Sequence, residues 1–403
     1  MVPRVVFPSS ILRGVVTLRV LNVIRFPIGG IRSYLRYTYS RIDADAYAST
    51  VLTIDVPEAQ LLPAGMAPLR VDLQTVPVSH AMPRLAIAAH NLLRRGEFGI
   101  AHSQGTTAAL VTQPSARLYG VPHIVTLHET FRAEQFSGVL GEAKRRLLAR
   151  VFGGVCSVVT VSIDARDNLL QHIPLRTEAA SRVQVIRNGV AVDTLRRESV
   201  ESAPELRSQP GIEPGVILLG YVGRFMPEKG FGVLVEAVRK LGERADELPR
   251  FIVVAVNDGA FVREYRQQVR DWGLERLFFF TGFQATAAGT LAELDAVLMP
   301  SLREACPLVA MEAMVLGCPL IASDCIGLRE LTDGTPAIRT VAGDAASLAE
   351  GIERFLRDPS RFRQAAAAYV PKARSVFDSS HAAAALTMLF TKAVATRAEP
   401  SHA

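Results

Sequence analysis

The chain has 403 residues, of which 49% are hydrophobic and 21% are charged, with a formal net charge of +6. This composition is typical of a folded protein and excludes a disordered chain. The length exceeds one ordinary hydrophobic core, so we expect two domains of about 200 residues each. No apolar run approaches the roughly 20 residues that span a bilayer. The four cysteines form no C-x-x-C pair, so we expect no metal site or disulfide framework and a reducing, cytoplasmic location.

The positive charge is concentrated in the first half. Residues 1–200 hold 23 Lys and Arg against 14 Asp and Glu, whereas residues 201–403 hold 22 against 25. A basic half suits an anionic partner such as a phosphorylated acceptor or an anionic lipid surface, and ordinary surface charge is the alternative. We expect no nucleic acid, because aromatic and basic residues do not interleave and no nucleic-acid-binding module occurs.

The first half alternates apolar strand patterns with helical periodicity, which predicts a parallel sheet wrapped by helices. Residues 1–16 are expected to be an extension, 17–195 the N-terminal domain and 196–215 a polar, proline-containing linker. The expected strands are 18–24, 49–54, 99–103, 123–127, 157–161 and 183–186, and the expected helices are 31–40, 83–95, 105–119, 139–152 and 163–171.

A second alternating set occupies 216–377, and an alanine-rich segment follows at 378–403. Its expected strands are 216–222, 251–256, 277–281, 296–299 and 319–322, and its expected helices are 231–241 and 307–316. The predicted fold class is therefore α/β, with two doubly wound Rossmann-like domains facing a cleft. The C-terminal helix is expected to pack back on the N-terminal domain.

Two glutamates separated by seven residues, Glu304 and Glu312, carry the strongest functional signal. Glu304 follows the strand at 296–299, and Glu312 lies in the next helix, so both are near the carboxyl end of a strand. Open α/β sheets bind ligands there. For the spacing alone, two unrelated glutamates are the alternative.

A strand-to-helix loop in the second half, Gly223-Arg224-x4-Lys229-Gly230, holds two cations. Two cations beside a helix N-terminus form an anion site suited to a diphosphate. A structural glycine turn is the alternative. The loop matches neither the Walker A pattern nor the dinucleotide pattern G-x-G-x-x-G.

The first half offers two further candidates. Gly29-Gly30 lies between a strand and a helix, where uncovered N–H groups allow a phosphate or sugar to approach, unless the pair only forms a tight turn. His128 follows the strand at 123–127 and could bind a sugar hydroxyl or a phosphate oxygen, or be satisfied by the backbone. A polar turn at 103–105 could contact an acceptor.

In their order and spacing these motifs, with Gly317-Cys318-Pro319 after them, resemble the retaining glycosyltransferases of family 4, which have the GT-B fold. The resemblance covers roughly residues 17–395 and implies an acceptor-binding N-terminal domain and a nucleotide-sugar site in the C-terminal domain. The donor-binding residues that it implies are Gly29, Gly30, Gly223, Arg224, Lys229, Glu304, Cys306, Pro307, Leu308 and Glu312.

The resemblance also implies roles. Arg224 and Lys229 would neutralise the diphosphate, Glu312 would accept hydrogen bonds from the ribose, and Glu304 would lie near the transferred sugar. The catalytic residues would be His128, Glu304, Arg224 and Lys229. The chain departs from the family at Cys306-Pro307, where an aromatic residue and a glycine are common, and a proline removes one N–H donor.

The expected activity is transfer of a sugar from a UDP- or GDP-sugar to a sugar, lipid-linked or small-molecule acceptor, with retention of configuration. No suitable D-x-D pair occurs, so we expect no metal and no cofactor. A cell-surface polysaccharide, a glycolipid or a glycosylated metabolite would each suit as product. A nucleotide-sugar epimerase, a phosphorylase or an inactive nucleotide-sugar-binding protein are the alternatives.

A basic helix at 139–152 is a candidate contact with the inner face of a membrane. Its cations are Lys144, Arg145, Arg146 and Arg150. Such a helix could rest on an anionic lipid surface, or it could be an ordinary solvated face.

Overall fold

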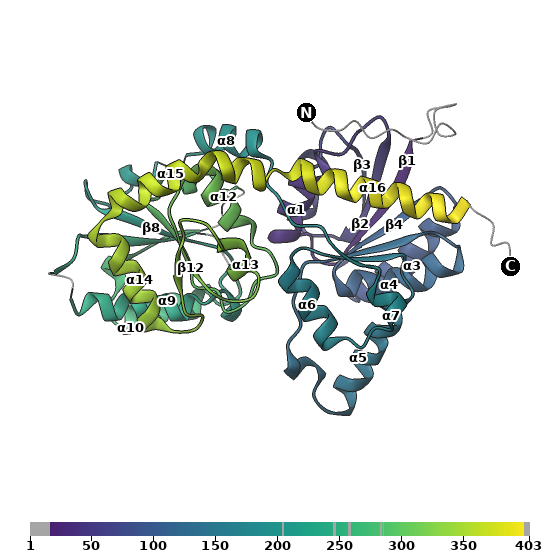
Figure 1. Ribbon diagram of the computed structural model, residues 1–403, viewed down its shortest axis with the longest axis horizontal. Coiled ribbons are helices and arrows are strands. Elements are labelled where there is room, and N and C mark those ends of the chain that lie inside the picture. The colour runs from purple at the N-terminus through teal and green to yellow at the C-terminus, as the bar shows by residue number, and fades with distance from the viewer. Residues whose placement is uncertain are drawn as a thin grey trace. The chain divides into compact units, whose positions relative to one another are not determined.

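The computed structural model describes residues 17–203, 205–244, 247–256, 259–282, 284 and 286–398. The expected extension at 1–16 lies outside these residues. The described chain forms two compact α/β units (Figure 1). Unit 1 contains 17–161, 168–186 and 380–398, and unit 2 contains 162–167 and 187–379.

The sheet of unit 1 has seven parallel strands in the order β3-β2-β1-β4-β5-β6-β7. They are β1 (Leu18–Ile24), β2 (Tyr47–Ile54), β3 (Arg70–Val76), β4 (Ile100–Gln104), β5 (His123–Leu127), β6 (Ser157–Thr160) and β7 (Val183–Val185). The six strands expected from the sequence are present. The seventh, β3, was not foreseen, because it is a sheet edge whose residues are mostly polar and only partly buried.

Helices cover both faces of this sheet. They are α1 (Gly30–Tyr39), α2 (Leu62–Gly65), α3 (Ala81–Arg94), α4 (Thr106–Leu118), α5 (Gly138–Gly153), α6 (Ile163–His172), α7 (Thr177–Ala180) and α16 (Ser379–Ala398), with 3-10 turns η1 (Pro57–Leu61) and η2 (Ala133–Phe136). Helix α16 packs on unit 1, as expected. The Tyr47 hydroxyl lies 3.2 Å from Thr391 Oγ1, and the ring centroids of Phe390 and His102 are 5.4 Å apart.

Unit 2 has a six-stranded parallel sheet in the order β10-β9-β8-β11-β12-β13. Its strands are β8 (Ile217–Val222), β9 (Phe251–Val256), β10 (Phe278–Gly282), β11 (Ala296–Met299), β12 (Leu320–Ser323) and β13 (Ile338–Thr340). Its helices are α8 (Val192–Glu201), α9 (Phe231–Gly242), α10 (Val262–Asp271), α11 (Ala288–Glu293), α12 (Leu308–Leu316), α13 (Leu328–Thr332), α14 (Ala345–Arg357) and α15 (Pro359–Val376), with 3-10 turns η3 (Leu206–Ser208), η4 (Pro227–Lys229) and η6 (Glu275–Leu277).

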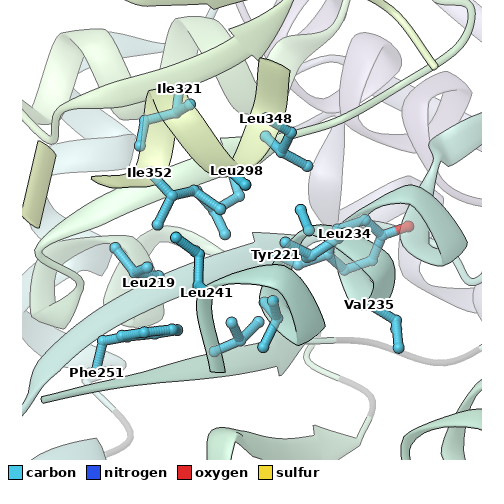
Figure 2. Close-up of a cluster of buried hydrophobic side chains, with 14 of the residues drawn as sticks. Leu219, Tyr221, Leu234, Val235, Leu241, Phe251, Leu298, Ile321, Leu348 and Ile352 are labelled. Atoms are coloured by element: carbon cyan, nitrogen blue, oxygen red, sulfur yellow. The ribbon is translucent and has the colours of Figure 1, made fainter. Parts of the chain in front are cut away.

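The core of unit 2 lies between its sheet and the pair α9 and α14, with α12 and α15 on the other side of the sheet (Figure 1). Figure 2 shows Leu219 of β8, Leu241 of α9 and Ile352 of α14 converging in this layer. Each is buried, and burial of one such side chain contributes about 1.5–3 kcal/mol. This packing fixes the strand ends from which the functional loops emerge.

The segment expected to be a linker, 196–215, belongs to unit 2 instead. It holds the end of α8, whose Val192 and Leu195 are buried, and the turn η3. Arg207 of η3 donates to both carboxylate oxygens of Asp295, at 3.0 Å each. The segment appeared structureless because so few of its residues face the core. After β7 the chain passes from unit 1 to unit 2 between residues 186 and 187, and it returns to unit 1 after residue 379.

In each sheet the strand order reverses at one point, between β1 and β4 in unit 1 and between β8 and β11 in unit 2. Open α/β sheets bind ligands at such a reversal, beyond the carboxyl ends of the strands. The loops after β8 and β11 are those that hold the candidate cations and Glu304.

Two histidines are enclosed in the sheet of unit 1. His102 and His123 are fully buried, and burial lowers the pKa of each to about 3 from an ordinary 6.5. His123 Nε2 lies 2.8 Å from Ser103 Oγ, and His123 Nδ1 lies 2.5 Å from Gln113 Oε1. Both rings are therefore neutral hydrogen-bonded members of the core.

We predict that His123→Asn makes folding less sensitive to acid. The folded pKa lies below the unfolded pKa, so unfolding takes up a proton between pH 6.5 and 3 and stability falls as the pH falls through this window. One such histidine contributes a slope of about 1.4 kcal/mol per pH unit. Urea unfolding followed by circular dichroism from pH 6 to 4 should show this slope reduced. Ser103→Ala, which keeps the titrating ring, should keep the slope, and an unchanged slope in His123→Asn would contradict the assignment.

Candidate functional site

The loops after β8 and β11 meet through an ion pair. Lys229 Nζ lies 2.7 Å and 2.8 Å from the two carboxylate oxygens of Glu304. The Glu304 side chain is only 7% exposed, and Lys229 is partly exposed. A carboxylate this deeply buried is costly unless it is paired, so Lys229 and Glu304 hold each other at the strand ends. The structure thus brings together two residues that the sequence predicted separately.

A glycine allows these loops to touch. Gly230 has φ +71°, and a Cβ at this position would lie 1.9 Å from the carbonyl oxygen of Pro300. The Leu302 amide donates to the Glu228 carbonyl at 2.8 Å and joins the same two loops. Only glycine combines this left-handed backbone with such close contact. Gly230 therefore fixes the distance between the Lys229 loop and the Glu304 loop.

Glu304 is also held from its own side. Ser301 Oγ donates to one carboxylate oxygen at 2.9 Å, and Ser323 Oγ donates to the Ser301 carbonyl at 2.5 Å. The Glu304 amide donates to the Ile326 carbonyl at 3.1 Å, and a Cβ on Gly327 would lie 2.5 Å from the Glu304 carbonyl oxygen. The sequence predictions gave no role to Ser301 or Gly327. The only hint of these roles in the sequence is that a serine and a glycine occur in the loops that follow β11 and β12.

The other predicted donor residues of this loop pair lie at the same strand ends. Gly223 directly follows β8. A Cβ at this position would contact only the Tyr221 side chain, 3.9 Å from its hydroxyl oxygen, so the Gly223 backbone leaves room for a ligand. Arg224 is half-buried, and its carbonyl accepts from the Tyr221 hydroxyl at 3.0 Å. Glu312, in the second turn of α12, is 5% exposed.

The departure at Cys306-Pro307 forms the entry to α12. Burial raises the pKa of the Cys306 thiol to about 12, so this thiol is protonated at neutral pH and is no nucleophile. Asn188 Nδ2 donates to the Cys306 carbonyl at 3.1 Å. Pro307 is the N-cap of α12 and gives no side-chain cap, and Leu308, the first helical residue, is buried.

The remaining predicted residues lie in unit 1. Gly29, with φ +57°, is the N-cap of α1, and a Cβ on Gly30 would meet no atom within 4 Å. His128 follows β5 and lies with Nε2 2.9 Å from Gln104 Oε1. Its burial lowers the pKa of His128 to about 3, so the ring is neutral at pH 7. Residues 103 and 104, expected in a polar turn, are instead buried at the end of β4 and cannot contact an acceptor.

Within the part of the chain that the structure describes, no group of three or more His, Cys, Asp or Glu residues is arranged to hold a metal ion. No helix in the same residues is both long and apolar enough to cross a membrane.

Two family descriptions match the chain in tandem: residues 28–194 match "Glycosyltransferase Family 4" and residues 216–358 match "Glycosyl transferases group 1". A D-inositol 3-phosphate glycosyltransferase of Frankia alni is 30% identical over 288 residues, which are 68% of this chain and 69% of that protein. The chain belongs to the group 1, family 4 glycosyltransferases. A 2-deoxystreptamine glucosyltransferase of Streptomyces kanamyceticus is 29% identical over 276 residues, 64% of this glycosyltransferase and 68% of that protein.

Solved structures confirm the GT-B fold of this glycosyltransferase. Anabaena HepE in complex with UDP and glucose has a TM-score of 0.78 at 21% identity, covering 93% of this chain and 100% of HepE. Sucrose-phosphate synthase of Thermosynechococcus elongatus has a TM-score of 0.75 at 18% identity, covering 94% of this chain and 100% of that one. The predicted pair of Rossmann-like domains is therefore correct.

We predict that Gly230→Ala separates the two loops of this glycosyltransferase and disrupts the Lys229–Glu304 pair. The matched control is Gly273→Ala, because Gly273 has φ +65° but open space around a Cβ. Left-handed strain alone costs about 1–2 kcal/mol, and the contact with Pro300 adds to it only at Gly230. Thermal unfolding should show a larger loss for Gly230→Ala than for the control. Equal losses would show that the loops tolerate the extra atom.

Proposed function

We propose that this glycosyltransferase moves a sugar from a nucleoside-diphosphate sugar to an acceptor hydroxyl, with retention of configuration and without a bound metal ion. The observation that carries the proposal is the Lys229–Glu304 pair at the strand-order reversal of unit 2. It sets a cation for a phosphate beside a carboxylate for sugar hydroxyls, at the position where sheets of this kind bind nucleotides.

The donor would be bound mainly by side chains of unit 2. Arg224 and Lys229 would face the diphosphate, with Gly223 allowing close approach. Fixed cations stabilise the charge that builds on a leaving diphosphate, and no metal is required for this. The N–H groups that begin α12 add partial positive charge.

Carboxylates would bind the hydroxyl groups of the donor. Glu312 would accept hydrogen bonds from the ribose, and Glu304 would accept them from the transferred sugar, because a carboxylate offers lone pairs to two neighbouring hydroxyls. Cys306, Pro307 and Leu308 would line the donor side of the loop. HepE was solved with UDP and with UDP-glucose. We therefore favour a uridine donor over a guanosine donor.

In the proposed reaction the bond between the anomeric carbon and the diphosphate oxygen breaks, and its electron pair goes to the diphosphate. The acceptor oxygen bonds to the anomeric carbon on the same face, and its proton passes to an oxygen of the leaving phosphate. His128 and the Gly29-Gly30 backbone of unit 1 would contact the substrates. Since the Cys306 thiol is protonated, no cysteine nucleophile takes part.

The names of the relatives point to polyhydroxylated acceptors, among them 2-deoxystreptamine, inositol 3-phosphate and a glycogen chain. We propose an acceptor of this class, in the synthesis of a polysaccharide, a glycolipid or a glycosylated metabolite. Incubation with a donor alone separates transfer from the alternatives. An epimerase would convert the donor, a phosphorylase would act on a glycan with phosphate, and an inactive protein would only bind.

We predict that Lys229→Ala weakens binding of UDP about 10- to 100-fold, because it removes a charged hydrogen bond worth about 1.5–3 kcal/mol. Glu304→Gln should bind UDP nearly as well but lose about 100-fold in transfer to 2-deoxystreptamine or inositol 3-phosphate, as expected for a contact to the reacting sugar. Calorimetry and nucleotide release measure the two effects. Lys240→Ala, near the other end of α9, is the matched control. Wild-type behaviour of Lys229→Ala, Glu304→Gln and Glu312→Ala together would refute the assignment.

We also propose that α5 rests on an anionic membrane. Val139 and Leu140 are 87% and 86% exposed, and Leu147 lies on the same side of the helix, so α5 presents apolar side chains to solvent. The exposed cations Lys144, Arg146 and Arg150 flank them. Glu142 pairs with Arg145 and Arg146 and offsets part of this charge. An apolar stripe with flanking cations is typical of helices in a lipid headgroup layer.

We predict that the chain sediments with phosphatidylserine-containing vesicles and that the double variant Val139→Asp, Leu140→Asp remains in the supernatant. The change removes the apolar contact and adds charges that anionic lipid repels. Leu118→Asp, at another exposed leucine, in α4, is the control and should sediment like the wild type. Sedimentation of the double variant at the wild-type level would exclude α5 as the membrane contact.

A further inference from the structure

His128 stands at one end of a buried hydrogen-bond network in unit 1. Its Nε2 lies 2.9 Å from Oε1 of Gln104, a residue only 2% exposed at the end of β4. Gln104 Nε2 donates to Asn22 Oδ1 at 3.1 Å, and Asn22 Nδ2 donates to Ser49 Oγ at 2.9 Å. The two amides thus lie head to tail. Because Gln104 uses its NH₂ group towards Asn22, it presents only an acceptor to His128.

The same network continues to a second histidine and supports this direction. The Tyr39 hydroxyl donates to Asn22 Oδ1 at 2.7 Å and lies 2.5 Å from His102 Nδ1. His102 Nε2 lies 2.7 Å from Thr126 Oγ1. Gln104 Nε2 also lies 3.3 Å from His102 Nδ1, so its NH₂ group faces both Asn22 and His102. Asn22 Oδ1 then accepts from both Tyr39 and Gln104, so the Gln104 oxygen is directed at His128.

The other contacts of His128 fix its ring but not its second nitrogen. The Tyr34 ring packs on the imidazole with centroids 4.6 Å apart, and Tyr34 is itself hydrogen-bonded to Thr126. Among the described residues, Nδ1 of His128 has no hydrogen-bond partner, and it keeps some solvent-accessible surface, because it is not one of the fully buried polar atoms that lack a partner. The titratable groups that interact with the ring are Tyr34 and His102, and His102 is itself neutral.

We propose that Gln104 is a positioning residue that holds His128 as the neutral Nε2–H tautomer, with the Nδ1 lone pair presented to a hydroxyl of the substrates. Gln104 is too buried to touch a ligand and acts only through His128. Its location agrees with this role, because β4 adjoins the strand-order reversal of unit 1 and β5, which carries His128, is the next strand.

The proposal narrows what His128 can do. A neutral ring whose accessible nitrogen is an acceptor cannot bind a phosphate oxygen, which is also an acceptor. It can accept a hydrogen bond from a sugar hydroxyl, and burial, which lowers the pKa of His128 to about 3, keeps it in this state at neutral pH. The kinetic part of the inference rests on the proposed function, whereas the tautomer does not.

The tautomer is measured directly in the full-length wild type labelled with ¹⁵N-histidine. At pH 7 we expect a protonated Nε2 and an unprotonated Nδ1 for His128, whose signals are assigned by their loss in His128→Gln. A protonated Nδ1, with Nε2 bare or as the imidazolium, would overturn the proposal. This spectrum needs no substrate, so it decides the tautomer even if no transfer activity is found.

The variant Gln104→Glu tests the positioning role. A carboxylate at this site still accepts from Nε2–H but stabilises the imidazolium, so the pKa of His128 should rise and Nδ1 should become protonated. We expect kcat to fall about 10- to 100-fold at pH 7, with little change in the donor KM, and to recover as the pH is raised.

The matched control is Gln113→Glu. The side-chain oxygen of Gln113, in α4, contacts the His123 ring as the side-chain oxygen of Gln104 contacts the His128 ring. The control should change the His123 signals and leave the His128 signals and kcat near wild type. Equal kcat losses in both variants, or unchanged His128 signals in Gln104→Glu, would reduce Gln104 to a packing residue. Absence of transfer from every donor in the wild type would instead remove the proposed function and leave the tautomer standing.

Discussion

The buried ion pair between Lys229 and Glu304 is the interaction on which the architecture of the candidate site depends. Removing a charge from water costs several kcal/mol per ion, so the pair forms only where two loops can bring both charges together with further hydrogen bonds. The strand-order reversal supplies two such loops, after β8 and β11. Gly230 lets them touch, and Ser301 satisfies a carboxylate oxygen that Lys229 shares. Residues that lie far apart in the sequence therefore all support the contact between Lys229 and Glu304.

The two units approach their chemistry in opposite ways. At the strand ends of unit 2, Lys229 and Glu304 form an ion pair before any ligand binds. Unit 1 collects neutral polar groups, among which the imidazole rings of His102 and His128 stay uncharged at neutral pH. Fixed charge suits the stabilisation of a leaving group, and neutral acceptors suit the orientation of hydroxyls. This difference agrees with the division between donor and acceptor domains that the family resemblance implies.

The sequence predicts well whatever depends on continuous apolar runs. Strands β1, β5, β9 and β11 have the expected bounds, because strands buried on both faces of a parallel sheet are mostly apolar. The edge strand β3 and the helix α8 were missed, since each buries few side chains. Lys229 and Glu304 were predicted from their places after strands, but their contact was not, because it depends on the φ of Gly230 and on loop packing. Gln104 was assigned to a surface turn, because a polar residue beside a glycine usually marks a turn.

The departure at Cys306-Pro307 increases the importance of the cations. A helix begins with four N–H groups that can face an anion, and Pro307 at the N-cap of α12 removes one of them. The Cys306 thiol does not replace this N–H group, because a buried, protonated thiol is only a weak hydrogen-bond donor. A diphosphate at this position would therefore rely more on side-chain charge than on backbone dipoles. In the proposed function that charge would come from Arg224 and Lys229, and the ion pair with Glu304 holds Lys229 at the strand ends.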